Sequence, residues 1–172
     1  MGFETTAVLV MDVQQGIVGR YGTADDYLAG IAKAADAARK AGIKVIYVTV
    51  SFREGRPEIS KRNKMLGNIA PTGFVTGDQS TSVHPAVAPA AGDIHVTKRR
   101  VSAFAGSDLD VVLRAGNTDT LILCGIATSG VVLSDGCLDM DPEVHRVLTE
   151  KVFVRQADVK TIAEWVQEVE AG

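Results

Sequence analysis

The sequence contains few residues of the kinds that build disulfide frameworks or metal centres. It has only two cysteines, Cys124 and Cys137, which lack CxxC spacing, so both are expected to be ordinary thiols. Its three histidines, His84, His95 and His145, lie far apart with no HxH or HxxxH grouping. Neither GxGxxG nor GxxxxGK[ST] is present. We therefore predict no metal ion and no other cofactor.

Long apolar runs and an excess of positive charge are also missing. No apolar stretch approaches the roughly 18 residues needed to cross a bilayer, and the first residues do not resemble a secretion signal. The chain has 18 Lys and Arg residues against 21 Asp and Glu residues, which gives a net charge of -3. We expect a cytoplasmic protein with neither a membrane partner nor a nucleic-acid partner.

What the sequence does contain is an alternation of strand-like and helix-like segments. Its length of 172 residues and its 46% hydrophobic content predict a single domain, residues 1–172, with one core. Nearly unbroken apolar runs, typical of strands covered on both faces, occupy 6–13, 43–50 and 120–124, with weaker runs at 94–97 and 152–154. Amphipathic segments begin near Tyr27, Leu109, Pro142 and Asp158. This alternation predicts a three-layer α/β/α parallel sheet of the Rossmann-like kind.

One segment, residues 53–91, departs from this alternation. It is rich in Gly, Pro, Ser and Thr and is longer than an ordinary connection. Two interpretations stay open, namely a lid over one end of the sheet and a surface insertion without a role.

The candidate site lies where the predicted strands end. Asp12 closes the first strand, Lys98 closes the strand at 94–97, and residues 125–129 follow the strand at 120–124. Because the carboxyl ends of parallel strands meet at one edge, these three segments are expected to converge. A carboxylate within an apolar run needs a cationic or hydrogen-bonding partner, which Lys98 can supply. A purely structural role for Asp12 at the strand end stays open at this point.

Three motifs in this order resemble the isochorismatase-like hydrolase superfamily. They are LVMDVQQG around Asp12, VTKRRVSAF around Lys98, and LILCGIATSGVV after the run at 120–124. The resemblance covers most of the chain, from residue 6 to about 134, with a similar tail at 135–165. It implies a parallel α/β fold and hydrolysis of a small molecule.

The resemblance also implies a catalytic triad. In it Asp12 is the general base, Lys98 lowers the pKa of a thiol, and a cysteine six residues after Gly125 is the nucleophile. Position 131 holds valine, so Val131 marks the nucleophile position without being reactive. True isochorismatases also lack the thiol and protonate a vinyl ether through the aspartate before water attacks.

Five residues near these motifs are predicted to contact the substrate. They are Gln14, Arg53, Phe104, Ala127 and Thr128. Arg99 is a further cationic candidate beside Lys98.

The chain departs from the family pattern after the third motif. Only VVLS separates residues 129–130 from DGCLDMDPEVHRVL, which resembles the sequence that normally follows the next core strand. A parallel crossover with its helix needs about 10–12 residues, so this stretch cannot hold one. We therefore expect five strands instead of six, with an apolar surface left uncovered and a homo-oligomer that covers it.

Two functions remain in view. The first, which we favour because both the Asp12 and the Lys98 motifs are intact, is an isochorismatase-like hydrolase that uses this pair without a cysteine. The second is a non-catalytic member of the superfamily that binds a ligand or forms an oligomer, which the valine at position 131 favours.

Overall fold

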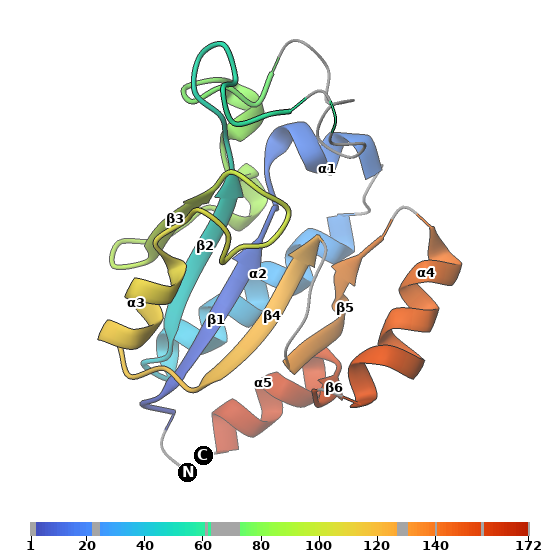
Figure 1. The fold of residues 1–172 in the computed structure, drawn as a ribbon. Coiled ribbons are helices and arrows are strands. Elements are labelled where there is room, and N and C mark those ends of the chain that lie inside the picture. Colours follow the sequence, from blue (N-terminus) through green and yellow to red (C-terminus); the bar gives the residue numbers. More distant parts are fainter. Residues whose placement is uncertain are drawn as a thin grey trace.

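The computed structural model describes residues 3–21, 25–60, 62, 73–126, 131–139, 141–155 and 157–171. They form a parallel sheet of six strands in the order β3-β2-β1-β4-β5-β6 (Figure 1). The strands are β1 (Thr6–Met11), β2 (Lys44–Val50), β3 (Ile94–Lys98), β4 (Thr120–Ile126), β5 (Val131–Leu138) and β6 (Val159–Lys160). Every side chain of β1 is buried, as its unbroken apolar run predicts for a central strand.

Helices cover both faces of this sheet. They are α1 (Gln15–Tyr21), α2 (Asp25–Lys40), α3 (Leu109–Ala115), α4 (Pro142–Val147) and α5 (Ile162–Ala171). Helices α2 and α5 share one hydrophobic core with β1, β2 and β4, and α3 packs in a second core on the other face. The three-layer parallel α/β architecture is therefore confirmed. No helix among the described residues is both long enough and apolar enough to cross a bilayer.

The expectation of five strands is wrong, because the sheet has six. The apolar run at 152–154 is not a strand: it belongs to a π-helical turn, η3 (Leu148–Val152), and a 3-10 turn, η4 (Phe153–Arg155), that continue α4. Residues 131–138 instead form β5, and β5 pairs with β6. Phe153 is buried against Val132 of β5, whereas Val152 and Val154 on either side of it are exposed.

Helix boundaries follow local hydrogen bonding. Asp141 caps α4, since its side chain accepts hydrogen bonds from the backbone N–H groups of Glu143 and Val144. Asp158 does not begin the last helix, because its carbonyl oxygen accepts a hydrogen bond from Val132 at 3.1 Å and draws the chain into β6.

The described part of the segment at 53–91 folds onto α1. Phe52 and Phe74 form a small buried cluster, and the guanidinium of Arg20 lies 5.2 Å from the centre of the Phe74 ring. The segment also contains two 3-10 turns, η1 (Gln79–Thr81) and η2 (Pro85–Val87). Residues 61 and 63–72 lie outside the described part, so a lid role stays a prediction.

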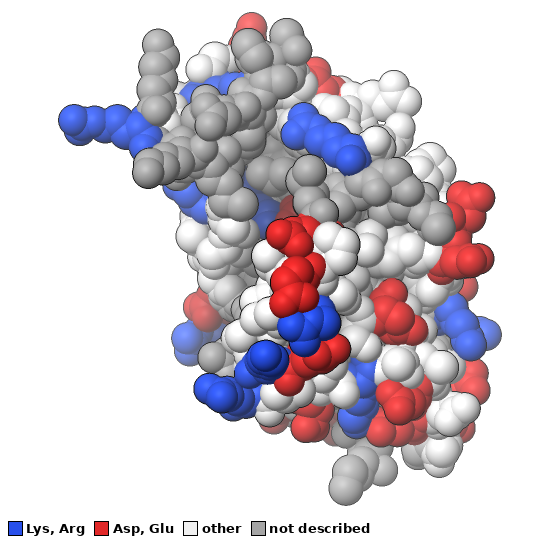
Figure 2. All heavy atoms as spheres, turned by 90° about the vertical axis from the view of Figure 1, so that its right-hand side faces the viewer, with Lys and Arg blue, Asp and Glu red and all other residues white. Residues whose placement is uncertain are grey.

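The surface charge is mixed on the side that carries α4 (Figure 2). Acidic and basic side chains are interspersed there without an extended patch of one sign. Arg146 of α4, for example, forms ion pairs with Glu143 and Glu150 at 2.7 and 2.8 Å.

Candidate active site

Asp12 and Lys98 form a buried ion pair at the carboxyl edge of the sheet. The Lys98 Nζ lies 2.5 Å from the Asp12 Oδ2, although β2 separates the strands that carry the two residues. Lys98 also donates a hydrogen bond to the Val101 carbonyl oxygen at 3.0 Å. The side chains of Lys98 and Asp12 are 4% and 9% exposed. The structure therefore brings the two residues of the predicted pair into direct contact.

The backbone around Asp12 is held in an unusual conformation. Asp12 has a φ of 58°, a left-handed conformation that few non-glycine residues adopt, and its N–H donates to the Val48 carbonyl oxygen at 2.9 Å. Gly125 of β4 pairs with Met11 beside it, with a φ of 118°. A Cβ atom at position 125 would collide with the Met11 backbone, so only glycine fits there.

The Asp12 carboxyl is set apart from an ordinary salt-bridged carboxylate by its surroundings. Burial raises the pKa of Asp12, and the neighbouring Lys98 charge offsets this only in part. Its second oxygen, Oδ1, is buried and accepts no hydrogen bond from any described residue. The group therefore combines a raised pKa with an oxygen that no described residue hydrogen-bonds.

Gln14 lies close by, but its amide is occupied by backbone groups. The side chain is fully buried. Its Nε2 donates to the carbonyl oxygens of Val50 and Thr81, both at 2.9 Å, and its Oε1 accepts from the Val50 N–H at 2.8 Å. Both amide hydrogens are thus used, so Gln14 fixes the end of β2 and the loop at Thr81.

Arg53 and Arg99 meet at Glu58, a residue that sequence reasoning did not single out. Arg53 Nη1 donates to Glu58 Oε1 at 2.6 Å, and Arg99 Nε lies 3.6 Å from the same oxygen. Arg99 also donates to the Ser51 carbonyl oxygen at 2.8 Å. Burial acts to raise the pKa of Glu58, but hydrogen bonds from its own N–H and from Arg53 outweigh it and lower that pKa.

The remaining predicted residues are placed less closely or not at all. Phe104 is 51% exposed in the loop after β3. Val131 opens β5 and pairs with Ile122, three positions before Gly125 and so roughly 10 Å from the edge at 3.3 Å per residue. Ala127 and Thr128 lie outside the described residues.

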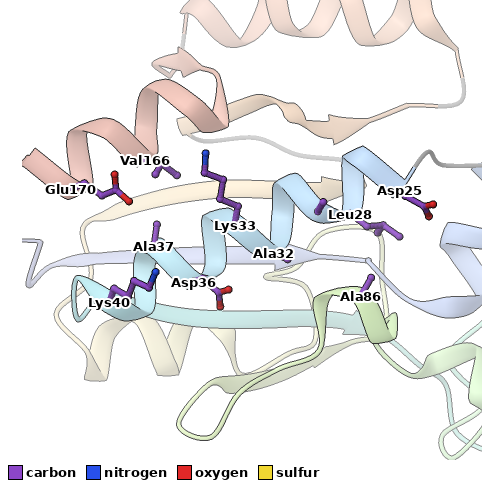
Figure 3. Close-up of a pocket in the computed structure, with 11 residues that line it drawn as sticks. Asp25, Leu28, Ala32, Lys33, Asp36, Ala37, Lys40, Ala86, Val166 and Glu170 are labelled. Carbon is purple, nitrogen blue, oxygen red and sulfur yellow. The ribbon is translucent and has the colours of Figure 1, made fainter.

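A separate groove of about 680 Å³ runs along α2 (Figure 3). Val166 and Glu170 of α5 lie on one side of it and Ala86 on the other. Neither Asp12 nor Lys98 lines this groove, so the groove is separate from the Asp12–Lys98 pair. Among the described residues, no group of three or more His, Cys, Asp or Glu side chains could hold a metal ion.

A parallel three-layer sheet with a charged pair buried at its carboxyl edge defines the class of α/β proteins that take their ligands at that edge. The family model for the isochorismatase domain matches residues 6–151. The chain therefore belongs to the isochorismatase family, a family of hydrolases.

Individual relatives match over nearly the whole chain. The uncharacterized isochorismatase family protein YwoC of Bacillus subtilis is 27% identical over 183 residues, which cover 97% of this chain and 95% of YwoC. The ureidoacrylate amidohydrolase RutB of Stutzerimonas stutzeri is 29% identical and covers 96% of this chain, which spans 80% of RutB. Both alignments are longer than the 172-residue chain, so each relative has residues without a counterpart here.

The fold has a solved counterpart of similar length. A cysteine hydrolase from Pseudomonas syringae pv. phaseolicola 1448A superposes with a TM-score of 0.87 at 26% identity. The match covers 99% of this chain and 95% of that one.

Proposed function

We propose that the chain hydrolyses a small molecule through acid–base chemistry of Asp12 and Lys98, without a cysteine nucleophile. The observation that carries this proposal is the buried Asp12–Lys98 pair, in which Asp12 has a raised pKa and one oxygen that no described residue hydrogen-bonds. A carboxyl group with a raised pKa keeps its proton to a higher pH than an exposed one, which favours a role as general acid.

The proposed reaction has two steps. The Asp12 carboxyl transfers its proton to the substrate, and the substrate cation that forms is attacked by water, which breaks the bond to the leaving group. The carboxylate left on Asp12 is stabilised by the Lys98 ammonium at 2.5 Å. Asp12 then recovers a proton from the attacking water, so one water is consumed for each bond cleaved.

The substrate class follows from this chemistry and from the relatives. A bond that protonation labilises, such as a vinyl ether, fits a site without a thiol. RutB, by its name, is an amidohydrolase, so amides belong in the same test. Arg53, Phe104, Ala127 and Thr128 keep their proposed roles in substrate contact, and for Gln14 the hydrogen bonds favour a positioning role.

The second candidate is a family member that binds a ligand without catalysis. Its support is position 131, which holds valine and lies in β5 rather than at the edge with Asp12. In that case the buried pair would recognise a ligand instead of turning it over.

We also propose that the chain forms a homo-oligomer. Three exposed valines on the segment at 142–155, Val144, Val152 and Val154, support this, because a second copy would remove them from water.

A panel of vinyl-ether, nicotinamide and carbamoyl substrates tests the first candidate. We expect turnover of at least one class by the wild type, and a loss of about 10²–10⁴-fold in Asp12→Asn, the range for general acid–base assistance. Cys124→Ala and Cys137→Ala serve as controls and should retain wild-type rates. No turnover of any class by the wild type would favour the second candidate, and inactivation by a thiol reagent would contradict a mechanism without cysteine.

A further inference from the structure

The ends of β1 and β2 are joined by a side chain instead of by the backbone. The parallel ladder between the two strands stops at Met11 and Val48, and the next residue, Asp12, has a left-handed conformation. Strand β2 continues for two more residues to Val50, whose N–H and carbonyl oxygen both bind the Gln14 carboxamide. The amide of Gln14 thus takes the place of a peptide group that β1 no longer supplies.

This junction lies at the level of the sheet that carries the Asp12–Lys98 pair. Val50 is the register partner of Lys98, and the Ser51 N–H donates to the Lys98 carbonyl oxygen at 3.3 Å, so the backbone holds β2 to β3 there. Strand β2 lies between β1 and β3 (Figure 1), and adjacent strands are about 4.8 Å apart. The side chain of Lys98 therefore crosses β2 to reach Asp12. Any widening between the ends of β1 and β2 would pull the two charges apart.

The Gln14 amide is fully buried and fully used. Burying an amide costs free energy unless its polar atoms are hydrogen-bonded, and the side chain of Gln14 is 0% exposed. Its two N–H groups and its oxygen bind backbone groups of Val50 and Thr81 at 2.8 to 2.9 Å. The loop at Thr81 also pairs with the chain after β1, since the Gln15 N–H donates to the Ser82 carbonyl oxygen at 2.9 Å. Gln14 therefore fixes β1, β2 and this loop relative to one another.

We propose that Gln14 is a positioning residue for the Asp12–Lys98 pair, because its carboxamide keeps the end of β2 against β1 where Lys98 crosses to Asp12. Both of its N–H donors are used by backbone oxygens, so Gln14 acts through the strand ends and not by donating to the Asp12 carboxylate. The inference rests on the proposed function only in its consequence for turnover. There, Gln14 determines whether the ammonium stabilises the carboxylate that proton transfer leaves on Asp12.

NMR of the Lys98 side chain tests this role without any substrate. In the full chain labelled with ¹⁵N-lysine, a buried ammonium that donates two hydrogen bonds should exchange its protons slowly with water, and Lys98→Met identifies the signal by its absence. Gln14→Met keeps the length of the side chain and removes every hydrogen bond of the amide. We expect exchange at Lys98 to become at least about tenfold faster, the effect of about one lost hydrogen bond.

Tyr47→Phe is the matched control. It removes a buried hydroxyl from the same strand, three positions before Val50, where that hydroxyl accepts a hydrogen bond from Arg39 Nη2 at 3.1 Å. Exchange at Lys98 should stay within about threefold of the wild-type rate, because this hydrogen bond shares no partner with the junction. Equal acceleration in Gln14→Met and Tyr47→Phe would mean that any buried polar group of β2 has this effect, and would overturn the proposal.

Gln14→Glu provides a rescue within one protein. A carboxylate accepts hydrogen bonds but donates none, so it would face the carbonyl oxygens of Val50 and Thr81 without a donor. Protonation restores one O–H donor, and burial favours the protonated form. Relative to the wild type at the same pH, exchange at Lys98 should be faster at about pH 8 and close to the wild-type rate at about pH 5. A ratio that is the same at both pH values would contradict the role of these hydrogen bonds.

Turnover separates this inference from the catalytic proposal. On a substrate of the panel that the wild type cleaves, Gln14→Met should lower kcat by about 10–100-fold and change KM by less than about threefold, as loss of alignment does. If no substrate is turned over but Gln14→Met accelerates exchange at Lys98, the positioning role stands and the acid–base proposal fails. If turnover depends on Asp12 while Gln14→Met changes neither kcat nor the exchange at Lys98, the positioning role fails and the hydrolase proposal stands.

Discussion

At the scale of single residues, Asp12 links chemistry to stability. Its carboxyl is buried, and burial raises its pKa above the ordinary value of 3.8. Between that value and the raised pKa, the folded protein binds a proton that the unfolded chain has released. The contribution of Asp12 to the free energy of unfolding therefore falls as pH rises through this interval.

Asp12→Asn should remove this pH dependence. Urea unfolding between pH 4 and pH 8 is expected to give a stability difference, wild type minus variant, that decreases as pH rises across the interval. Asp26→Asn, which replaces an exposed carboxylate of α2, should retain the wild-type slope. Parallel profiles for wild type and Asp12→Asn would show that the pKa of Asp12 is not raised.

The sequence predicts both residues of the Asp12–Lys98 pair, but it does not predict the contacts of the residues around them. An aspartate in an apolar run needs a cationic partner, and the parallel topology predicts that a lysine at the end of another strand lies near it. Glu58 gives no such signal, because it lies within a Gly- and Pro-rich segment and its partners are 5 and 41 positions away. The amide of Gln14 likewise reaches Thr81, 67 positions along the chain.

At the scale of elements, the sequence predicts β1, β2, β3 and β4 well and the region after β4 poorly. Strands β1, β2 and β4 are nearly unbroken apolar runs, and β3 is a weaker one. Strand β5 is instead interrupted by polar and glycine residues, and its pairing with β4 shifts register between Leu123 and Gly125. Such a bulged strand has no clear period, and the stretch before it is too short for a crossover helix, so the sequence predicts one strand fewer.

The register of β5 predicts the outcome of restoring a cysteine. Val131 pairs with Ile122 and so lies about 10 Å from the edge that carries Asp12, a separation that a thiolate cannot bridge to a shared substrate atom. Val131→Cys should therefore gain no amidase activity on the nicotinamide and carbamoyl substrates. The same variant should react with a thiol reagent after unfolding, which confirms that the new thiol is present. A gain of amidase activity would mean that residue 131 reaches the edge in the working protein.

At the scale of the whole molecule, the parallel order of the sheet follows from alternation of strands and helices. Residues 6–126 contain β1 to β4. Helices α1 and α2 connect β1 to β2, and α3 connects β3 to β4. Between β4 and β5 the chain has only residues 127–130, too few for a helix. This short connection begins at the carboxyl end of β4, which lies next to the end of β1 and so next to Asp12.

The exposed valines of the segment at 142–155 predict self-association. Val144, Val152 and Val154 are 42%, 36% and 54% exposed, and burying a valine fully stabilises by about 1.5–3 kcal/mol. Light scattering after size exclusion should give a mass of at least two chains at micromolar concentration. Val144→Asp combined with Val154→Asp should shift the mass to that of one 18.2 kDa chain, because two carboxylates would be buried in the contact. Val111→Asp, at a valine of α3 that is 67% exposed, is the control and should keep the wild-type mass, whereas a wild-type monomer at 100 μM would exclude the contact.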